Sequence, residues 1–389
     1  MIAMRSRVKR VAAIAADALL VMLVPFLAGR GQDSDLPASP RVLLIRCDHL
    51  GDAAMATAVL GPLRAALTPA ALDVLASPWA APVFDAHPDV DRVITFAMPW
   101  WSAAKGASLR QRARQWVLLP GLIFRIRAAR YDVGIDLRGD LRHIALFLAL
   151  GGMRVRASSD RTGGRRLLTH VGAHRDSLHE VEKNGAIASL LGATDPFRPS
   201  IAAGGALPDW LVPLLGGRAF ERGFVAFALR GSASKRSWPA AHARAVADLL
   251  RARLGIGSVY VGLRGEEGFG PPTDGGEEPG IVNLAGRTTL AESIAVLRHA
   301  RMTIAVDSGP MHLAAAVGSP IVALFGPSDP CVFGPWSDRV RFLGTGVPCG
   351  CRERRCEVTP GGDCMRRILP DAVFSAVREL MEEQRSMHA

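Results

Sequence analysis

The sequence predicts an α/β protein made of two doubly wound domains, each built on a mostly parallel sheet. Two series of short apolar runs alternate with helical stretches along the 389 residues. The runs are apolar at consecutive positions, which is typical of strands buried on both faces of a parallel sheet. A stretch rich in Gly and Pro, 205–222, interrupts the alternation, and a chain of this length exceeds one ordinary core. We therefore expect domains at 41–215 and 216–389, after a basic and hydrophobic segment at 1–40.

The first series opens with RVLLIR at 41–46, followed by a Gly-containing turn and a helix over 53–66. Three further apolar runs predict strands, and a helix is expected around 142–152 after the last of them. These three strands are expected at 71–77, 90–96 and 131–137. Strands that alternate with helices in this way form an open parallel sheet.

The second series contains further apolar runs with helices between them, and it ends in a Cys-rich loop and a helix. Its strands are expected at 223–229, 258–263, 280–286, 302–308 and 320–326, and its helices over 239–254, over 289–300 and from about 310. Ligands of such sheets bind outside the carboxyl ends of the strands. The turns that follow the strands are therefore where chemistry is expected.

The composition is that of a basic globular protein. Hydrophobic residues make up 49% of the chain, and 47 Lys and Arg against 36 Asp and Glu give a net charge of +11. This excess indicates an acidic partner, either an anionic membrane surface or a phosphorylated substrate. No nucleic-acid-binding module is recognisable, so we expect no nucleic-acid partner. The sequence gives no basis for an oligomeric state.

Four of the six cysteines crowd into one loop, which is not a secretory pattern in a chain of this size. The loop sequence CGCRERRCEVTPGGDC could hold a structural metal, although its first pair is closer than zinc ligands usually are. Redox-sensitive thiols and plain loop thiols are the alternatives. The four cysteines are Cys349, Cys351, Cys356 and Cys364.

The N-terminal segment contains nineteen largely apolar residues, 11–29, after a basic stretch. A signal peptide or a membrane span is one interpretation, but Asp17 near the centre of a span would cost roughly 2.5–3.5 kcal/mol. A basic amphipathic helix on the inner membrane surface and a helix packed on the first domain are the other two. Both remain open.

The turn DSGPMH at 307–312 joins a strand to a helix, with Pro310 suited to the first helical turn. A hydroxyl, free backbone N–H groups and the helix dipole meet there, as in phosphate sites. The alternative is an Asp or Ser N-cap with His312 buried. The turn RGSASKRSWP at 230–239 offers small residues and two cations, again typical of phosphate binding. Its alternative is a solvated basic loop.

The first turn of the chain, RCDHLGD at 46–52, places Asp52 where a helix begins. A carboxylate there either caps the helix or acts as a general base. The residues alone leave both open.

Seven segments in order resemble glycosyltransferase family 9, the ADP-heptose:lipopolysaccharide heptosyltransferases, from about Arg41 to Ile368. These segments are RCDHLGD, HPDVDRVI, YDVGIDLRGDLRH, HEVEKN, SKRSWP, NLAGRTTLAE and DSGPMHLAAAVGSPIVALFGPSDP. The resemblance implies a GT-B fold, in which two Rossmann-like domains face each other across a cleft. It also implies an inverting, metal-independent transferase with an ADP-sugar donor and no required cofactor.

The resemblance also assigns roles to residues. Asp52 would be the general base on the acceptor hydroxyl, beside Asp48, His49 and Gly51, where Asp48 and His49 replace the small hydroxyl residues common in the family. Arg236, or Lys235 in a shifted register, would neutralise the pyrophosphate. The remaining donor contacts would come from Gly231, Ser232, Asp307, Ser308, Gly309, Pro310 and His312, with Glu266 or Glu267 on the ribose and Thr288 beside the adenine.

The implied enzyme moves a heptose-like sugar to a lipopolysaccharide core or a related anionic glycolipid, in the cytoplasm and peripheral to the inner membrane. The stretch 109–130 mixes Arg with Trp, Leu and Phe and fits a lipid surface or an acidic acceptor; an ordinary helix with a solvated Arg face is the alternative. Other nucleotide-sugar transferases, an epimerase, and a non-catalytic membrane-bound binding protein are the competing functions.

Overall fold

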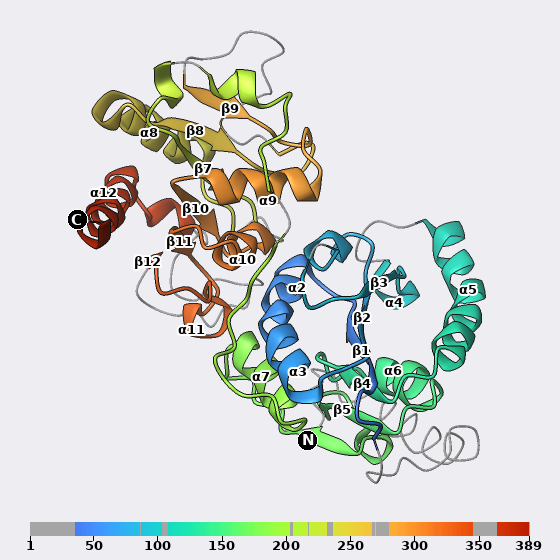
Figure 1. Ribbon diagram of the computed structural model, residues 1–389. Coiled ribbons are helices and arrows are strands. Elements are labelled where there is room, and N and C mark those ends of the chain that lie inside the picture. The colour runs from blue at the N-terminus through green and yellow to red at the C-terminus, as the bar shows by residue number, and fades with distance from the viewer. Residues whose placement is uncertain are drawn as a thin grey trace. The chain divides into compact units, whose positions relative to one another are not determined.

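The computed structural model describes residues 36–85, 87–102, 108–202, 205–216, 218–231, 236–266, 269, 280–344 and 364–388. The chain divides into two compact units, Met1–Pro199 and Ser200–Ala389. Each unit contains one six-stranded sheet with helices against it (Figure 1). The prediction of two doubly wound α/β domains is confirmed.

The first sheet is parallel throughout and has the strand order β3-β2-β1-β4-β5-β6. Its strands are β1 (Arg41–Arg46), β2 (Ala71–Ala76), β3 (Arg92–Thr95), β4 (Val133–Asp136), β5 (Val155–Ser159) and β6 (His170–Gly172). The first four lie where apolar runs predict strands. The pattern does not reveal β5, because its sequence VRASS is short and polar, yet all five residues are buried.

Six helices of the described residues accompany this sheet: α2 (Leu50–Ala56), α3 (Leu60–Leu67), α4 (Pro99–Ser102), α5 (Leu109–Ala128), α6 (Leu141–His143) and α7 (Glu180–Ser189). The turn Thr57–Val59 joins α2 to α3, and together they occupy the helix predicted over 53–66. The core of this unit packs Leu43 and Ile45 of β1 against Leu122 and Ile126 of α5 and against Phe147.

The second sheet repeats the plan of the first, with the parallel order β12-β11-β10-β7-β8-β9. Its strands are β7 (Phe224–Ala228), β8 (Gly257–Tyr260), β9 (Ile281–Asn283), β10 (Met302–Val306), β11 (Ile321–Phe325) and β12 (Val340–Gly344). Five lie in the predicted runs. The edge strand β12 escapes prediction because it is only half-buried, so its sequence lacks a continuous apolar run.

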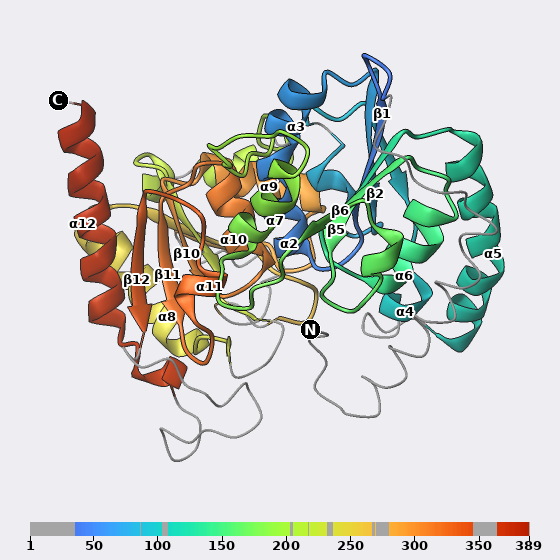
Figure 2. The same cartoon turned by 90° about the horizontal axis from the view of Figure 1, so that it is seen from below.

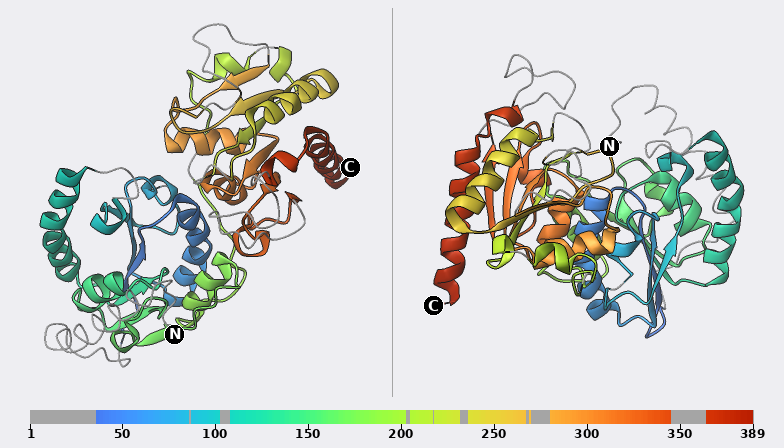
Figure 3. Two further views of the ribbon diagram at one scale, coloured as in Figure 1. Left: turned by 180° about the vertical axis from the view of Figure 1, so that it is seen from behind. Right: turned by 90° about the horizontal axis from the view of Figure 1, so that it is seen from above.

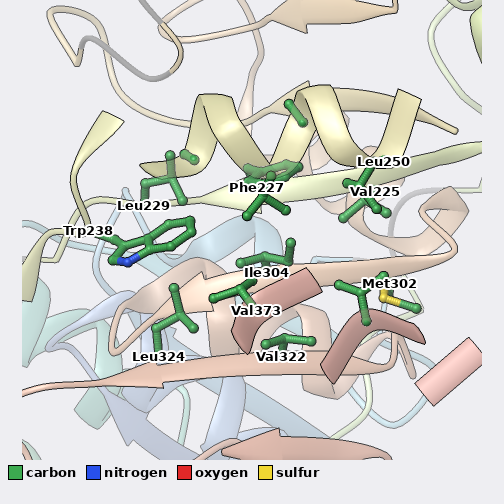
Figure 4. Close-up of a cluster of buried hydrophobic side chains, with 14 of the residues drawn as sticks. Val225, Phe227, Leu229, Trp238, Leu250, Met302, Ile304, Val322, Leu324 and Val373 are labelled. Carbon is green, nitrogen blue, oxygen red and sulfur yellow. The ribbon is translucent and has the colours of Figure 1, made fainter. Parts of the chain in front are cut away.

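The described helices of the second unit are α8 (Ala240–Leu249), α9 (Leu290–His299), α10 (Gly309–Ala316), α11 (Pro330–Phe333) and α12 (Pro370–His388). Figure 2 shows α12 lying beside β12 and β11. The main core of this unit packs Phe227 and Ile304 of the sheet with Val373 of α12, and Trp238 belongs to the same cluster (Figure 4).

The division between the units falls at Pro199, ahead of the predicted boundary in 205–222. The residues after it pack on the second unit. The Ile201 amide donates to the Ala316 carbonyl at 3.2 Å, and the Trp210 indole donates to Glu292 at 2.9 Å. Ile201 and Trp210 therefore contact α10 and α9 of the second unit, contacts that the Gly and Pro content of this stretch does not reveal.

Among the described residues, no helix has both the length and the apolar character needed to cross a membrane. The N-terminal segment 1–35, to which the membrane interpretations apply, lies outside them.

Candidate active site

Both sheets have a switch point, where the strand order reverses direction from the first strand. In the first sheet it lies between β1 and β4, and in the second between β7 and β10. Crevices at such points are where open α/β sheets bind ligands. The predicted site residues after β1, β7 and β10 thus stand at the carboxyl ends of the strands that flank these two points.

Arg46, the last residue of β1, is the centre of a buried cluster in the first unit. Its side chain is 1% exposed, and its guanidinium lies 3.0 Å from Asp48, 3.4 Å from Asp52 and 2.9 Å from Glu180. It also donates to the Leu137 carbonyl at 3.1 Å. A buried arginine is stable only when its donors are matched in this way.

Asp52 lies in the first turn of α2, where it faces Arg46 rather than capping the helix. The N-cap position is His49, which makes no side-chain cap, and the Asp52 carboxylate contacts Arg46. Burial and the neighbouring Asp48 raise the pKa of Asp52 from 3.8 to about 7, although Arg46 pulls it down. A carboxylate with a pKa close to neutral is suited to accept a proton at physiological pH.

Glu180 and Asn184 supply further acceptors for Arg46. They lie one turn apart on α7, and Asn184 accepts from Arg46 at 3.4 Å. Burial alone would raise the pKa of Glu180, but Arg46 and Lys183 hold it at about 2. Glu180 is therefore ionised over the pH range in which Asp52 titrates.

Asp48 connects the two strands of the switch point. Its other oxygen lies 2.6 Å from Arg138, which follows β4. The turn that carries Arg138 is fixed by Asp136, which accepts from the Asp140 amide and from Ser158, both at 3.0 Å, and contacts His143 at 2.9 Å. The pair of Asp136 and His143 is fully buried, so this turn is rigidly supported.

Of the three residues predicted to bind the acceptor, His49 is exposed, whereas Asp48 and Gly51 are buried. Sequence reasoning did not assign Arg46, Arg138 or Glu180. A charged residue at the carboxyl end of an apolar strand was the available signal for Arg46. The HEVE capping box, in which Glu180 follows His179, was the signal for the helix that brings Glu180 to the site.

In the second unit, Arg236 and Asp307 form the ion pair at the switch point. Arg236 follows β7, Asp307 follows β10, and their side chains meet at 2.9 Å. Arg236 keeps 26% exposure while Asp307 keeps 7%. The structure thus places the predicted diphosphate cation beside the predicted donor turn, with its guanidinium partly open to a ligand.

The turn after β10 leads directly into α10. Ser308 occupies the N-cap position without a side-chain cap, and its hydroxyl donates to the Val306 carbonyl at 3.0 Å. The N-cap interpretation therefore does not hold for Ser308. Gly309 and Pro310 open the helix, and His312 in its first turn is 6% exposed.

Gly231 permits the close approach of Arg236. A Cβ atom on Gly231 would lie 2.4 Å from Cβ of Arg236 and 3.3 Å from the Asp307 carbonyl. Only glycine fits between these two residues without displacing backbone or side chain. Its predicted role as a phosphate contact stays a prediction, but its role in packing the turn is visible.

Glu266 and Thr288 follow β8 and β9, so they lie at the same edge of the second sheet. Glu266 accepts from the Tyr260 hydroxyl at 2.8 Å, which together with burial raises the pKa of Tyr260. Thr288 shares a 2.8 Å hydrogen bond with Ser293 of α9. The Glu266 carboxylate and the Thr288 hydroxyl are thus each held by a neighbouring hydroxyl.

Several predicted residues lie outside the described part of the chain: Ser232, Lys235, Glu267, Cys349, Cys351 and Cys356. Cys364 is described, and its side chain is buried beside Gly326. The described residues contain no group of three or more His, Cys, Asp or Glu side chains that could hold a metal ion.

Two Rossmann-like sheets, each with charged side chains at its switch point, are typical of GT-B glycosyltransferases. The model of glycosyltransferase family 9 (heptosyltransferase) matches residues 121–360. The chain belongs to this family.

Curated relatives agree with the assignment. The chain is 26% identical over 300 residues to lipopolysaccharide heptosyltransferase 3 of Escherichia coli, covering 75% of this chain and 84% of that protein. It is 28% identical over 328 residues to lipopolysaccharide heptosyltransferase 1 of Pseudomonas aeruginosa, covering 82% and 88%.

Solved structures share the fold. ADP-heptose lps heptosyltransferase II of E. coli superposes with a TM-score of 0.69 at 21% identity, covering 89% of this chain and 99% of that one. E. coli heptosyltransferase WaaC with ADP-2-deoxy-2-fluoro heptose gives a TM-score of 0.67 at 22% identity, covering 87% and 99%.

Proposed function

We propose that this glycosyltransferase moves a heptose-like sugar from an ADP-sugar to a lipopolysaccharide core or a related anionic glycolipid, with inversion and without a metal ion. The relatives named lipopolysaccharide heptosyltransferases and the structure of E. coli heptosyltransferase WaaC with an ADP-heptose analogue support this choice. We place the reaction at the cytoplasmic face of the inner membrane, where a nucleotide-activated donor meets a growing glycolipid.

In the proposed reaction, Asp52 takes the proton of the acceptor hydroxyl as that oxygen attacks the anomeric carbon. The new C–O bond forms on one face while the bond to the β-phosphate breaks on the other, so the configuration inverts and ADP leaves. The single observation that carries this assignment is the pKa of Asp52, raised to about 7 in a cluster whose other carboxylates are paired with arginines. A base with such a pKa accelerates the step by about 10²–10⁴-fold.

Arg236 and the amino end of α10 would stabilise the departing diphosphate. A guanidinium at phosphate oxygens and the free N–H groups of a helix start supply the positive potential that a divalent ion supplies elsewhere. One preorganised donor at developing charge contributes about 3–4 kcal/mol. Asp307 holds Arg236 in this position at 2.9 Å.

The test is a calorimetric titration of the purified protein with ADP, GDP and UDP, with EDTA present throughout. Tight binding of ADP alone supports the donor, and a preference for UDP or GDP rejects it. A transfer assay with ADP-heptose and a heptose-free core acceptor then distinguishes the chemistry. Release of free sugar without an acceptor would point to an epimerase or hydrolase, and no turnover at all to a binding protein.

A further inference from the structure

We propose that α5 is an interfacial helix that docks the first unit on an anionic phospholipid surface. The outer face of α5 carries an apolar stripe that the described fold leaves exposed. Leu109, Val117 and Phe124 are 79%, 77% and 72% exposed, and Ala113 and Pro120 between them are exposed as well. Successive members are three or four residues apart, so they lie on one side of the helix.

The opposite side of α5 packs on the core of the first unit. Leu119, Leu122 and Ile126 are buried in the core of the first unit. Within that unit α5 lies at the outer margin of the ribbon (Figure 3). The apolar stripe is therefore not the face that the fold uses.

A row of arginines runs alongside the stripe. Arg110, Arg114 and Arg125 are exposed and share one side of α5, next to the apolar residues. Segment 93–131 contains one Lys and six Arg but no Asp or Glu. A helix with exposed apolar residues beside an unbroken positive charge fits the boundary between anionic headgroups and acyl chains.

Aromatic side chains support the same surface. Trp116 is 53% exposed, and its ring lies 5.9 Å from that of Trp100, over which the Arg142 guanidinium packs at 4.7 Å. Tryptophan prefers the headgroup level of a bilayer because one end of the ring is polar. A protein partner with an acidic groove is the competing occupant, but the length of the stripe, about 24 Å of helix, favours an extended flat surface.

The topology of the first sheet places the start of α5 at the same sheet edge as Asp52, the proposed base for the acceptor hydroxyl. The chain enters α5 after β3 and leaves it for β4, and in a parallel sheet the helix then starts at the carboxyl edge. Arg46 and Asp52 follow β1 at that same edge. Docking through the start of α5 would thus bring the Asp52 cluster to the membrane that carries a glycolipid acceptor, a reading that rests on the proposed function.

The experiment measures partitioning of the full chain onto sedimented vesicles that contain phosphatidylglycerol, with phosphatidylcholine vesicles for comparison. Arg110→Gln, Arg114→Gln and Arg125→Gln together should weaken partitioning about 100-fold, since each arginine near such a surface contributes about fivefold. Val117→Ser with Phe124→Ser should weaken it about tenfold. All five side chains are exposed, so the fold is expected to persist.

Matched controls change the same residue types elsewhere. Val212→Ser with Leu369→Ser, and Arg166→Gln with Arg253→Gln and Arg367→Gln, alter exposed residues outside α5 and should change partitioning less than twofold. Equal losses in both groups, or no loss in either α5 variant, overturn the proposal. Titration with ADP separates the two proposals: a wild-type chain that binds vesicles but not ADP refutes the donor and leaves the docking surface intact.

Discussion

The carboxylate of Asp48 lies 2.6 Å from Arg138 and so joins the ends of β1 and β4, the two strands of the first switch point. Its second oxygen lies 3.0 Å from Arg46. One buried aspartate thus fixes two arginines and sets the electrostatic surroundings of Asp52, whose pKa it helps to raise.

Removing the charge of Asp48 should shift the pH profile of the reaction. In Asp48→Asn the negative neighbour is lost, so the pKa of Asp52 falls, and the acidic limb of kcat/KM moves to lower pH by about one unit. Asp176→Asn, an exposed acid of the same unit, is the control and should leave the limb in place. An unmoved limb in Asp48→Asn would show that Asp52 is not the group that limits activity.

The variant Asp52→Asn should lose about 10²–10⁴-fold in kcat while it retains its affinity for ADP. Asparagine keeps the size of the side chain but accepts no proton from the acceptor. Steady-state kinetics combined with calorimetry separate these two effects. Undiminished turnover would remove Asp52 from the mechanism.

The same variant should be more stable than the wild type at alkaline pH. The folded-state pKa of about 7 exceeds the ordinary 3.8, so the native state binds the proton more tightly than the unfolded chain. Ionisation of Asp52 therefore lowers stability as pH rises from about 4 to about 7. The gain in the free energy of unfolding of Asp52→Asn should grow across this window and then level off at on the order of 4 kcal/mol, which thermal unfolding shows as a growing difference in Tm. A gain that is largest at acidic pH would contradict the raised pKa.

Arg236→Gln should weaken ADP binding about 10–100-fold, because a charge-assisted hydrogen bond to phosphate is lost. Arg236→Lys should recover part of the affinity, since lysine keeps the positive charge but lacks the paired N–H donors of the guanidinium. Calorimetry gives both values, with Arg253→Gln as an exposed control. Equal affinities in Arg236→Gln and the control would place the diphosphate elsewhere.

Gly231→Ala tests the packing of the same turn. The added methyl group would lie 2.4 Å from Cβ of Arg236, so it must push Arg236 away from Asp307. We expect ADP affinity to fall about tenfold or more, with a change in the free energy of unfolding of about 1–3 kcal/mol. Gly205→Ala, where nothing lies within 4 Å of the new atom, should change neither quantity.

Much of the fold follows from the sequence because parallel strands are buried on both faces. Runs such as FVAFA and IVALF therefore have no other stable position, and they appear as β7 and β11. By contrast, β5 contains Arg156, Ser158 and Ser159, whose burial depends on partners from β4 and the following turns. The sequence of a strand does not show which distant residues will form hydrogen bonds with its polar groups.

The candidate site likewise contains residues that the local sequence predicts and residues that it does not. Asp52, Arg236 and Asp307 each follow a recognisable turn, so their positions at the sheet edges can be predicted. Arg46 and Glu180 are in contact although they lie 134 positions apart in the sequence, and no local motif predicts such a contact. The alternatives in which Asp52 and Ser308 are helix caps were excluded only by side-chain geometry, which places Asp52 on Arg46 and Ser308 on a backbone carbonyl.

The indole of Trp238, two residues beyond Arg236, donates to the Ile368 carbonyl at 3.0 Å, and α12 then covers the core with Val373, Val377 and Leu380. A premature stop codon shortly before position 364 would therefore spare every residue assigned to the reaction and still deprive the core of the second unit of the side chains that α12 supplies. Gene variants that lose only this tail should behave as nulls through degradation of the polypeptide.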